Sequence, residues 1–255
     1  TINSEDQISP WYCLSFEDNP KNHFIRATRY SKKFNLLKKN ENIYSNKKIR
    51  IGYYAADFHE HAGMINMSGI FQNHNKNEFE IYAFYYGDIK KDKTHYRIKK
   101  FFDKFFYVND LDDTEIYNLS INNKVDIAIF RAGLTINARN TIFSHKVAPI
   151  QISFLGYPGT TGQDGIDYII ADKFVIPEQH QNFYSEKIIY LTNCYYPRDN
   201  LRNIGSKKYI RDDYKIPKNS FVFCSFNNSY KITEEEFKIW MTILNKVKNS
   251  PLLLL

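Results

Sequence analysis

Short apolar runs alternate with amphipathic segments along the middle of the chain, from residue 48 to residue 171. The apolar runs predict strands over residues 48–57, 79–86, 105–108, 125–130, 149–155 and 167–171. The segments between them predict helices over residues 63–74, 94–102, 114–122 and 137–146. Strands that alternate with short helices form parallel β-α-β units, so the pattern predicts an α/β fold with a doubly wound, mostly parallel, Rossmann-like sheet.

The two flanks of this region have a different pattern. Residues 1–48 are polar and basic with one predicted helix, over residues 22–37, and we interpret them as a leader or linker. Residues 195–218 are again polar and contain prolines and a glycine, which is typical of an interdomain linker. A strand, a helix and a second strand are then predicted over residues 220–226, 233–247 and 251–255. Because such a piece cannot cover both faces of its own parallel sheet, we expect residues 49–194 to form one domain and residues 219–255 to begin a second.

Composition narrows the class of protein. Hydrophobic residues make up 43% of the chain and aromatic residues 16%, which supplies a core and argues against disorder. The 35 lysines and arginines behind the net charge of +7 are scattered, often in pairs, so nucleic-acid binding is a weak alternative. The three cysteines lie far apart and no apolar run is long enough to span a membrane, so we expect a cytoplasmic protein without a disulfide framework or zinc site. The Walker, G-x-G-x-x-G, H-E-x-x-H and G-x-S-x-G signatures are missing as well.

The stretch from Leu155 to Gly162 is the strongest candidate for a binding site. It follows a predicted strand and contains three glycines, at which the backbone can adopt positive φ and come close to a ligand. Pro158 stiffens the turn, and Thr160 and Thr161 offer hydroxyl groups. We favour a ligand site here over a tight turn that merely ends a strand.

A series of motifs in one order gives the chain a family resemblance. The motifs are Gly52-Tyr53 with Asp57-Phe58 and His61, Gly133-Leu134-Thr135 with Ala138-Arg139, Ala148-Pro149-Ile150-Gln151, Leu155 to Gly162, Asp167 to Asp172, Tyr184-Ser185-Glu186-Lys187, and Ser225 to Lys231. Together they resemble the catalytic region of O-GlcNAc transferase and its bacterial and plant (SPINDLY-like) relatives. The resemblance covers nearly the whole chain, and the leader is similar to the segment that joins tetratricopeptide repeats to that region.

The resemblance implies a GT-B glycosyltransferase, in which two Rossmann-like halves face a cleft. It implies an inverting transfer of a GlcNAc-like sugar from a UDP-sugar to a Ser or Thr hydroxyl of an acceptor protein. No metal or other cofactor is expected, and tetratricopeptide repeats are expected upstream. In this family the first half supplies groups for the acceptor and the sugar, and the second half holds the uridine diphosphate.

The same resemblance assigns roles to individual residues. His61 is implied as the catalytic base or a sugar contact, and Lys231 as the cation that stabilises the leaving diphosphate, with Asn228 beside the nucleotide. The implied sugar-side residues are Thr135, Leu155, Gly156, Tyr157, Pro158, Gly159 and Thr160. Three places depart from the family pattern: Ala62 stands where a proline follows the histidine, Asn228 where glutamine is usual, and Phe130-Arg131-Ala132 where many bacterial relatives carry an acidic residue and then an apolar one.

Two other classes of protein stay open at this point. The first is a non-catalytic GT-B-like module that binds a protein partner, and the second is a basic nucleic-acid-binding domain. In the family, a threonine-rich helix start in the second half binds the diphosphate, and we expect it to lie beyond residue 255. We therefore expect the transferase activity to belong to a longer parent protein and this fragment to be inactive by itself.

Overall fold

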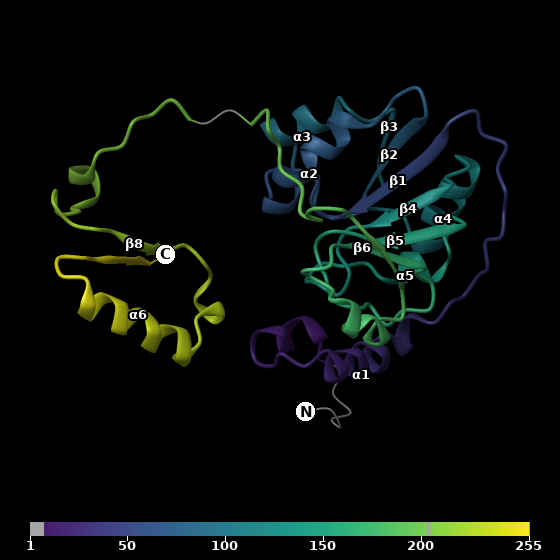
Figure 1. Cartoon of the computed structure of the whole chain (residues 1–255). Helices are drawn as coiled ribbons and strands as arrows, with labels where there is room; N and C mark the ends of the chain where they lie inside the picture. The colour runs from purple at the N-terminus through teal and green to yellow at the C-terminus, as the bar shows by residue number, and fades with distance from the viewer. Residues whose placement is uncertain (1–7, 203–204, 255) are drawn as a thin grey trace. The chain divides into compact units, whose positions relative to one another are not determined.

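The structure is a computed structural model that describes residues 8–202 and 205–254. The chain divides into two compact units, residues 1–201 and 202–255, which we describe separately. The first unit is built on a parallel sheet in the order β3-β2-β1-β4-β5-β6-β7 (Figure 1). Its strands are β1 (Ile49–Ala55), β2 (Phe79–Tyr85), β3 (Lys104–Tyr107), β4 (Ile127–Phe130), β5 (Ile150–Ser153), β6 (Tyr168–Ala171) and β7 (Lys187–Tyr190).

Helices cover both faces of this sheet, so the predicted doubly wound α/β fold is confirmed. Successive side chains of a strand point to opposite faces, and β1 therefore places Tyr53 in one core cluster and Tyr54 in the other. The Tyr53 cluster takes in residues of α2 (Ala62–Asn73) and α3 (Lys93–Lys99), whereas α4 (Asp113–Asn122) and α5 (Thr141–Ser144) pack on the Tyr54 side. Large rings fill both layers: Tyr54 stacks on Phe84 with 4.3 Å between ring centroids, and Tyr53 meets Phe71 edge to face at 5.0 Å.

The strand order reverses between β1 and β4. From β1 the chain proceeds outward to β2 and β3, and it then returns to β4 beside β1 and proceeds the other way to β7. Loops that leave the carboxyl ends of β1 and β4 therefore turn in opposite directions and open a crevice between them, where ligands of open α/β sheets usually bind. The residues that follow β1, β4 and β5 meet at this edge.

Three elements differ from the sequence prediction. The helix expected over residues 137–146 is only α5, because the chain before it forms turns in which Asn137 has a positive φ of 64°. The leader helix is α1 (Pro20–Ser31), which begins with Asn19 as N-cap and gives way to a 3-10 turn at residues 32–34. The short strand β7 was not predicted; it pairs with β6 and completes the sheet.

The described part of the leader packs against the glycine loop rather than forming a free linker. Ala27 of α1 is fully buried with Leu134 and Tyr157. The Ser31 hydroxyl donates a hydrogen bond to the carbonyl of Thr161 (2.6 Å). These contacts explain why the leader belongs to the first compact unit, despite its polar composition.

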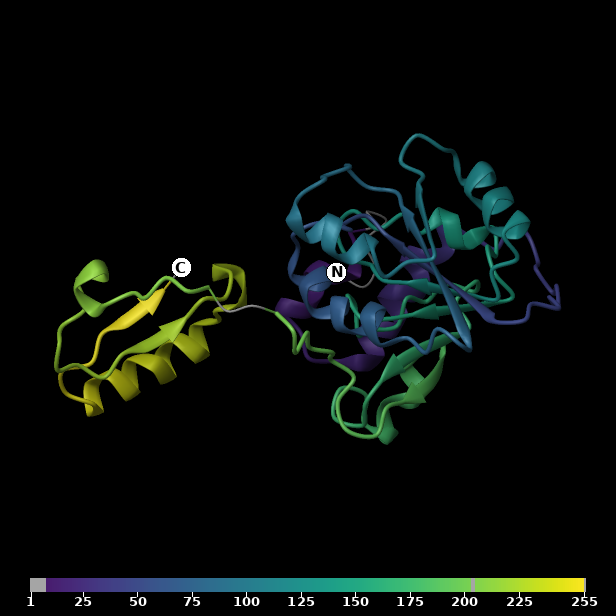
Figure 2. The same cartoon turned by 90° about the horizontal axis from the view of Figure 1, so that it is seen from above.

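The second unit contains a parallel pair of strands, β8 (Phe223–Ser225) and β9 (Leu252–Leu254), and α6 (Glu234–Lys246), which lies along one face of that pair (Figures 1 and 2). Thr233 caps α6 in a capping box with Glu236, as its sequence predicts. The unit boundary falls after Leu201, inside the predicted linker 195–218. Within the described residues of both units, no helix is long and apolar enough to cross a membrane.

Candidate active site

The reversal of strand order brings four residues together. Asp57 follows β1, Arg131 follows β4, Gly156 follows β5, and His61 is the N-cap of α2. All four lie beyond the carboxyl ends of parallel strands. His61 and the glycine loop therefore lie at the same edge of the sheet.

Asp57 is the centre of this group. Its Oδ2 lies 2.8 Å from Nδ1 of His61 and forms an ion pair with the guanidinium of Arg131. Asp57 and Arg131 are both buried. Burial alone would raise the pKa of Asp57, but the hydrogen bond from His61 and the charge of Arg131 outweigh it and lower the pKa below its usual value. Asp57 is therefore a carboxylate at neutral pH.

The contacts of His61 determine which ring nitrogen is free. Nδ1 lies 2.8 Å from the Asp57 carboxylate and 3.1 Å from the backbone nitrogen of Gly63, whose N–H can donate to Nδ1 only when Nδ1 carries no proton. A carboxylate can only accept, so in the neutral ring Nδ1 carries the proton and donates to the nearer partner, Asp57. Nε2 then holds the lone pair, and the side chain is 47% exposed. His61 thus presents a proton acceptor to solvent at the edge of the sheet.

The side chain of His59, two residues before His61, contacts Tyr85. Its side chain is half-buried, and Nδ1 lies 2.7 Å from the hydroxyl of Tyr85. Burial and the nearby charge of Lys90 lower the pKa of His59. His59 therefore belongs to the packing behind β2, in contrast to His61.

Close packing within the chain accounts for the three glycines of the loop. A Cβ at Gly156 would lie 2.6 Å from the carbonyl oxygen of Arg131, and one at Gly159 would lie 2.6 Å from Nε2 of His23. Gly162 is the member of this set with positive φ, at 63°, and it touches the backbone of Ala27 in α1. The sequence predicts that these glycines let the backbone approach a ligand. At Gly159 and Gly162 the structure shows that the backbone instead lies against the leader.

The two threonines are also engaged inside the protein. Glu186, which is buried, accepts a hydrogen bond from the Thr160 hydroxyl (2.7 Å) and from the Thr161 N–H (2.7 Å), and the Thr161 hydroxyl donates to it as well. The hydroxyl groups therefore hold the loop in place. The sequence had suggested that they are available to a ligand. Glu186 lies 25 positions from Thr161, so its contact with the loop could not be predicted from the sequence.

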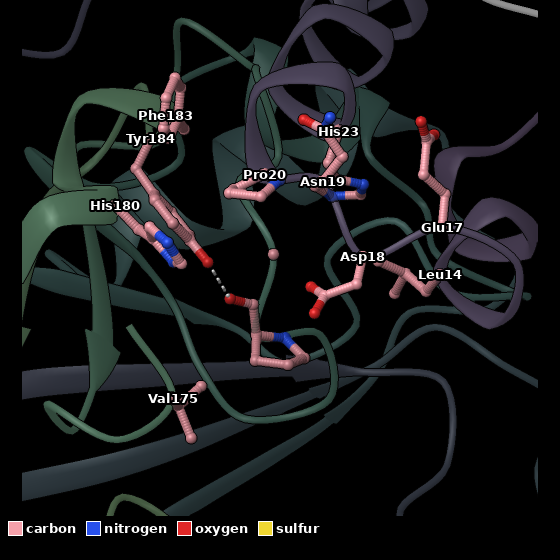
Figure 3. A pocket seen from close by; sticks show the side chains of 12 residues that line it. Leu14, Glu17, Asp18, Asn19, Pro20, His23, Val175, His180, Phe183 and Tyr184 are labelled. Carbon is pink, nitrogen blue, oxygen red and sulfur yellow. Dashed lines mark hydrogen bonds between the residues drawn. The ribbon is translucent and has the colours of Figure 1, made fainter. Parts of the chain in front are cut away.

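The segment before β7 supports the loop from the same side. Tyr184 donates its hydroxyl hydrogen to the carbonyl of Pro158 (3.0 Å), as Figure 3 shows. Beside this bond lies a pocket of about 190 Å³ between the leader and residues 175–184, lined in part by Asp18, Pro20 and His180 (Figure 3). It lies behind the glycine loop, on the side where α1 packs.

The predicted sugar-side residues fall into two groups. Leu155, Tyr157, Gly159 and Thr160 are buried, whereas Thr135, Gly156 and Pro158 are partly exposed. The Thr135 hydroxyl donates to the carbonyl of Ala132 (2.8 Å), which fixes the turn after β4. The loop therefore leaves residues 156 and 158 partly exposed, while the side chains of Leu155 and Tyr157 are buried.

Asn228 and Lys231 lie in the second unit, on the short 3-10 turn between β8 and α6. Both are exposed, and the N–H of Lys231 donates to the carbonyl of Asn228 (3.0 Å). The first turn of α6 carries three glutamates, Glu234 to Glu236, which already complement the positive end of the helix. An anion at this turn would therefore depend on Lys231 rather than on the helix N-terminus.

Comparison with known proteins identifies the family. The family model described as glycosyl transferase family 41 matches residues 25–208 and 204–255, so the chain belongs to this family. It is 36% identical over 214 residues, or 82% of its length, to the probable UDP-N-acetylglucosamine–peptide N-acetylglucosaminyltransferase SEC of Arabidopsis thaliana. It is 28% identical over 220 residues, again 82% of its length, to the UDP-N-acetylglucosamine–peptide N-acetylglucosaminyltransferase of Caenorhabditis elegans. The chain spans only about a fifth of these relatives, 22% and 18% of their lengths.

A solved structure shows the same fold. A mutant of the O-GlcNAc transferase of Thermobaculum terrenum superimposes with a TM-score of 0.81 at 22% identity, covering 96% of this chain and 47% of that one. The O-GlcNAc transferase resemblance and the GT-B fold predicted from the sequence are therefore confirmed. The roles of the individual site residues stay predictions.

Proposed function

We propose that this chain is the first half, and the beginning of the second half, of a transferase that moves N-acetylglucosamine from UDP-N-acetylglucosamine to a hydroxyl group of an acceptor protein. The observation that carries the proposal is the pairing of His61 with a buried carboxylate at the switch point of a family 41 sheet. The names of the relatives support the choice of sugar donor and peptide acceptor.

The proposed chemistry is an inverting displacement that needs no metal ion. Nε2 of His61 takes the proton of the acceptor hydroxyl while the oxygen attacks the anomeric carbon, and the bond from that carbon to the diphosphate breaks. Lys231 stabilises the negative charge that develops on the leaving diphosphate, and Asn228 binds near the nucleotide. On this proposal the backbone at residues 156 and 158, with Thr135, borders the sugar.

The wider setting is part of the same proposal. The cytoplasm is supported by Cys13, Cys194 and Cys224, which are free thiols. Tetratricopeptide repeats upstream are supported by the likeness of the leader to the segment that follows such repeats in the family. The isolated 255-residue chain is proposed to be inactive, because the donor site needs further residues of the second half.

A transfer assay on the full-length gene product tests the proposal. Labelled UDP-N-acetylglucosamine and an acceptor protein should give labelled acceptor at the same rate with and without EDTA. Lys231→Ala should lower turnover by about a hundredfold, the scale expected for losing a charge-stabilising group. The matched control is Lys238→Ala, an exposed lysine of α6 that pairs with Glu234. Abolition of transfer by EDTA, or equal rates in the two lysine variants, would reject the mechanism.

A further inference from the structure

We infer that Asp57, clamped by Arg131, is a positioning residue that sets the tautomer and orientation of His61; this inference rests on the proposed function. The carboxylate contacts Nδ1 of His61 on one side and the Arg131 guanidinium on the other. His61 and Asp57 come from the same turn after β1, whereas Arg131 comes from β4. The clamp therefore exists only because the two strands are neighbours at the switch point.

The fold provides a fitted slot for Arg131. A Cβ at Gly63 would lie 2.6 Å from its Nη1, and a Cβ at Gly156 would lie 3.2 Å from the same atom. Side chains at either position would push the guanidinium away from Asp57. Gly63 in α2 and Gly156 in the loop thus leave room for the guanidinium of Arg131 to lie between them.

The partners of Asp57 differ in kind from those of Asp172 in the same unit. Asp172 accepts hydrogen bonds from the backbone N–H groups of Phe174, Val175 and Tyr195, and it thereby fixes loops. Oδ2 of Asp57 contacts both His61 and Arg131. Its second oxygen, Oδ1, is buried without a hydrogen-bond partner among the described residues.

The charges around His61 define what the pair can do. The groups that face its ring are Asp57, Arg131 and, at 6.4 Å between ring centroids, His59. Arg131 keeps Asp57 ionised, so the carboxylate orients the ring and balances the charge of the imidazolium without taking up the proton itself. The same division of labour operates between the aspartate and the histidine of a catalytic triad.

Nitrogen NMR on the 255-residue chain with labelled histidine tests the tautomer without any activity. In the wild type, the neutral His61 ring should carry its proton on Nδ1. In Asp57→Ala that preference should be lost, while Asp88→Ala, which removes an exposed carboxylate after β2, should leave it unchanged. A wild-type ring protonated on Nε2, or a preference that survives Asp57→Ala, would overturn the inference whatever the function of the protein.

Kinetics on the full-length gene product test the coupling. Asp57→Ala should lower kcat about a hundredfold or more with little change in the KM of the sugar donor, and Arg131→Lys should retain more activity than Arg131→Met. In the His61→Ala background, Asp57→Ala should cost almost nothing further, because the two residues act as a unit. Equal losses in both backgrounds would overturn the inference. If the wild type transfers no sugar but shows the Nδ1 proton, the proposed function fails and the pairing stands.

Discussion

At the residue scale, the leader is attached to the glycine loop through one neutral side chain, that of His23. Nε2 of His23 lies 2.6 Å from the hydroxyl of Tyr157, whose ring also meets Trp11 at 6.2 Å between centroids. Burial, together with the charge of Arg26, lowers the pKa of His23 to about 4. The leader is therefore docked on the loop by a histidine that stays uncharged in the folded protein.

The first prediction concerns the effect of acid on this contact. The folded pKa of about 4 lies below the ordinary value of 6.5, so protons bind the unfolded chain first. The stabilisation by neutral His23 is complete above pH 6.5 and is lost as the pH falls toward 4, by roughly 3 kcal/mol. The free energy of unfolding of the wild type should therefore fall by about that amount more than that of His23→Gln between pH 7 and pH 4, measured by denaturant titration. Parallel curves for the two proteins would contradict this.

At the scale of single elements, the loop from Leu155 to Gly162 is held by neighbours on both sides. The leader contacts it at Gly159 and Gly162, and Glu186 accepts hydrogen bonds from Thr160 and Thr161. An acceptor that serves several buried donors is costly to remove, because each donor then stays unsatisfied. The loop is thus held rigidly, with Gly156 and Pro158 partly exposed.

Removal of Glu186 measures this support. Glu186→Ala leaves the Thr160 hydroxyl and the hydroxyl and N–H of Thr161 without their acceptor, so the free energy of unfolding should fall by about 3 kcal/mol. Glu178→Ala, which removes an exposed glutamate paired with Lys173, should change it by less than about 0.5 kcal/mol. Urea titrations followed by circular dichroism give both values. A similar small effect in both variants would mean that other residues hold the loop.

The sequence predicted the elements better than it predicted the loop. Strands such as β1, β2 and β4 are apolar runs because they are buried on both faces, and that pattern is visible locally. The strand β7 has only four residues and alternates between half-buried and exposed positions, so it gave no such signal. The spacing of apolar residues predicts a helix over 137–146. The helix in the structure is shorter because the chain before it forms turns, with left-handed backbone at Asn137.

The candidate site was predictable in part. His61 was found through the family motif, and the spacing of four residues between Asp57 and His61 was visible, although their pairing was not recognised. The pairing of Arg131 with Asp57 is not predictable from the sequence, because the two residues lie 74 positions apart. The glycines and threonines of the loop suggest a ligand site when the sequence is read alone. Their actual partners, His23, Ala27 and Glu186, are distant in the chain, so this packing could not be predicted.

At the scale of the whole molecule, the proposed nucleotide contacts, Asn228 and Lys231, have the least structural support. Asn228 and Lys231 are exposed, and a single ion pair in water is worth only about 1 kcal/mol. We therefore predict that calorimetry on the 255-residue chain detects no UDP binding at micromolar concentration. Micromolar binding would mean that these residues hold the nucleotide by themselves, and the division of roles between the two halves would be wrong.

The central claim is that His61 is the proton acceptor of a protein glycosyltransferase. Its most direct test is the rate of N-acetylglucosamine transfer by the full-length gene product in two matched variants. His61→Ala should lose about a hundredfold in turnover, the scale of losing a general base. His59→Ala, which removes a histidine of the same turn that contacts Tyr85 instead of Asp57, should stay within a few-fold of the wild type. Equal rates in wild type and His61→Ala, or a larger loss in His59→Ala, would contradict the account.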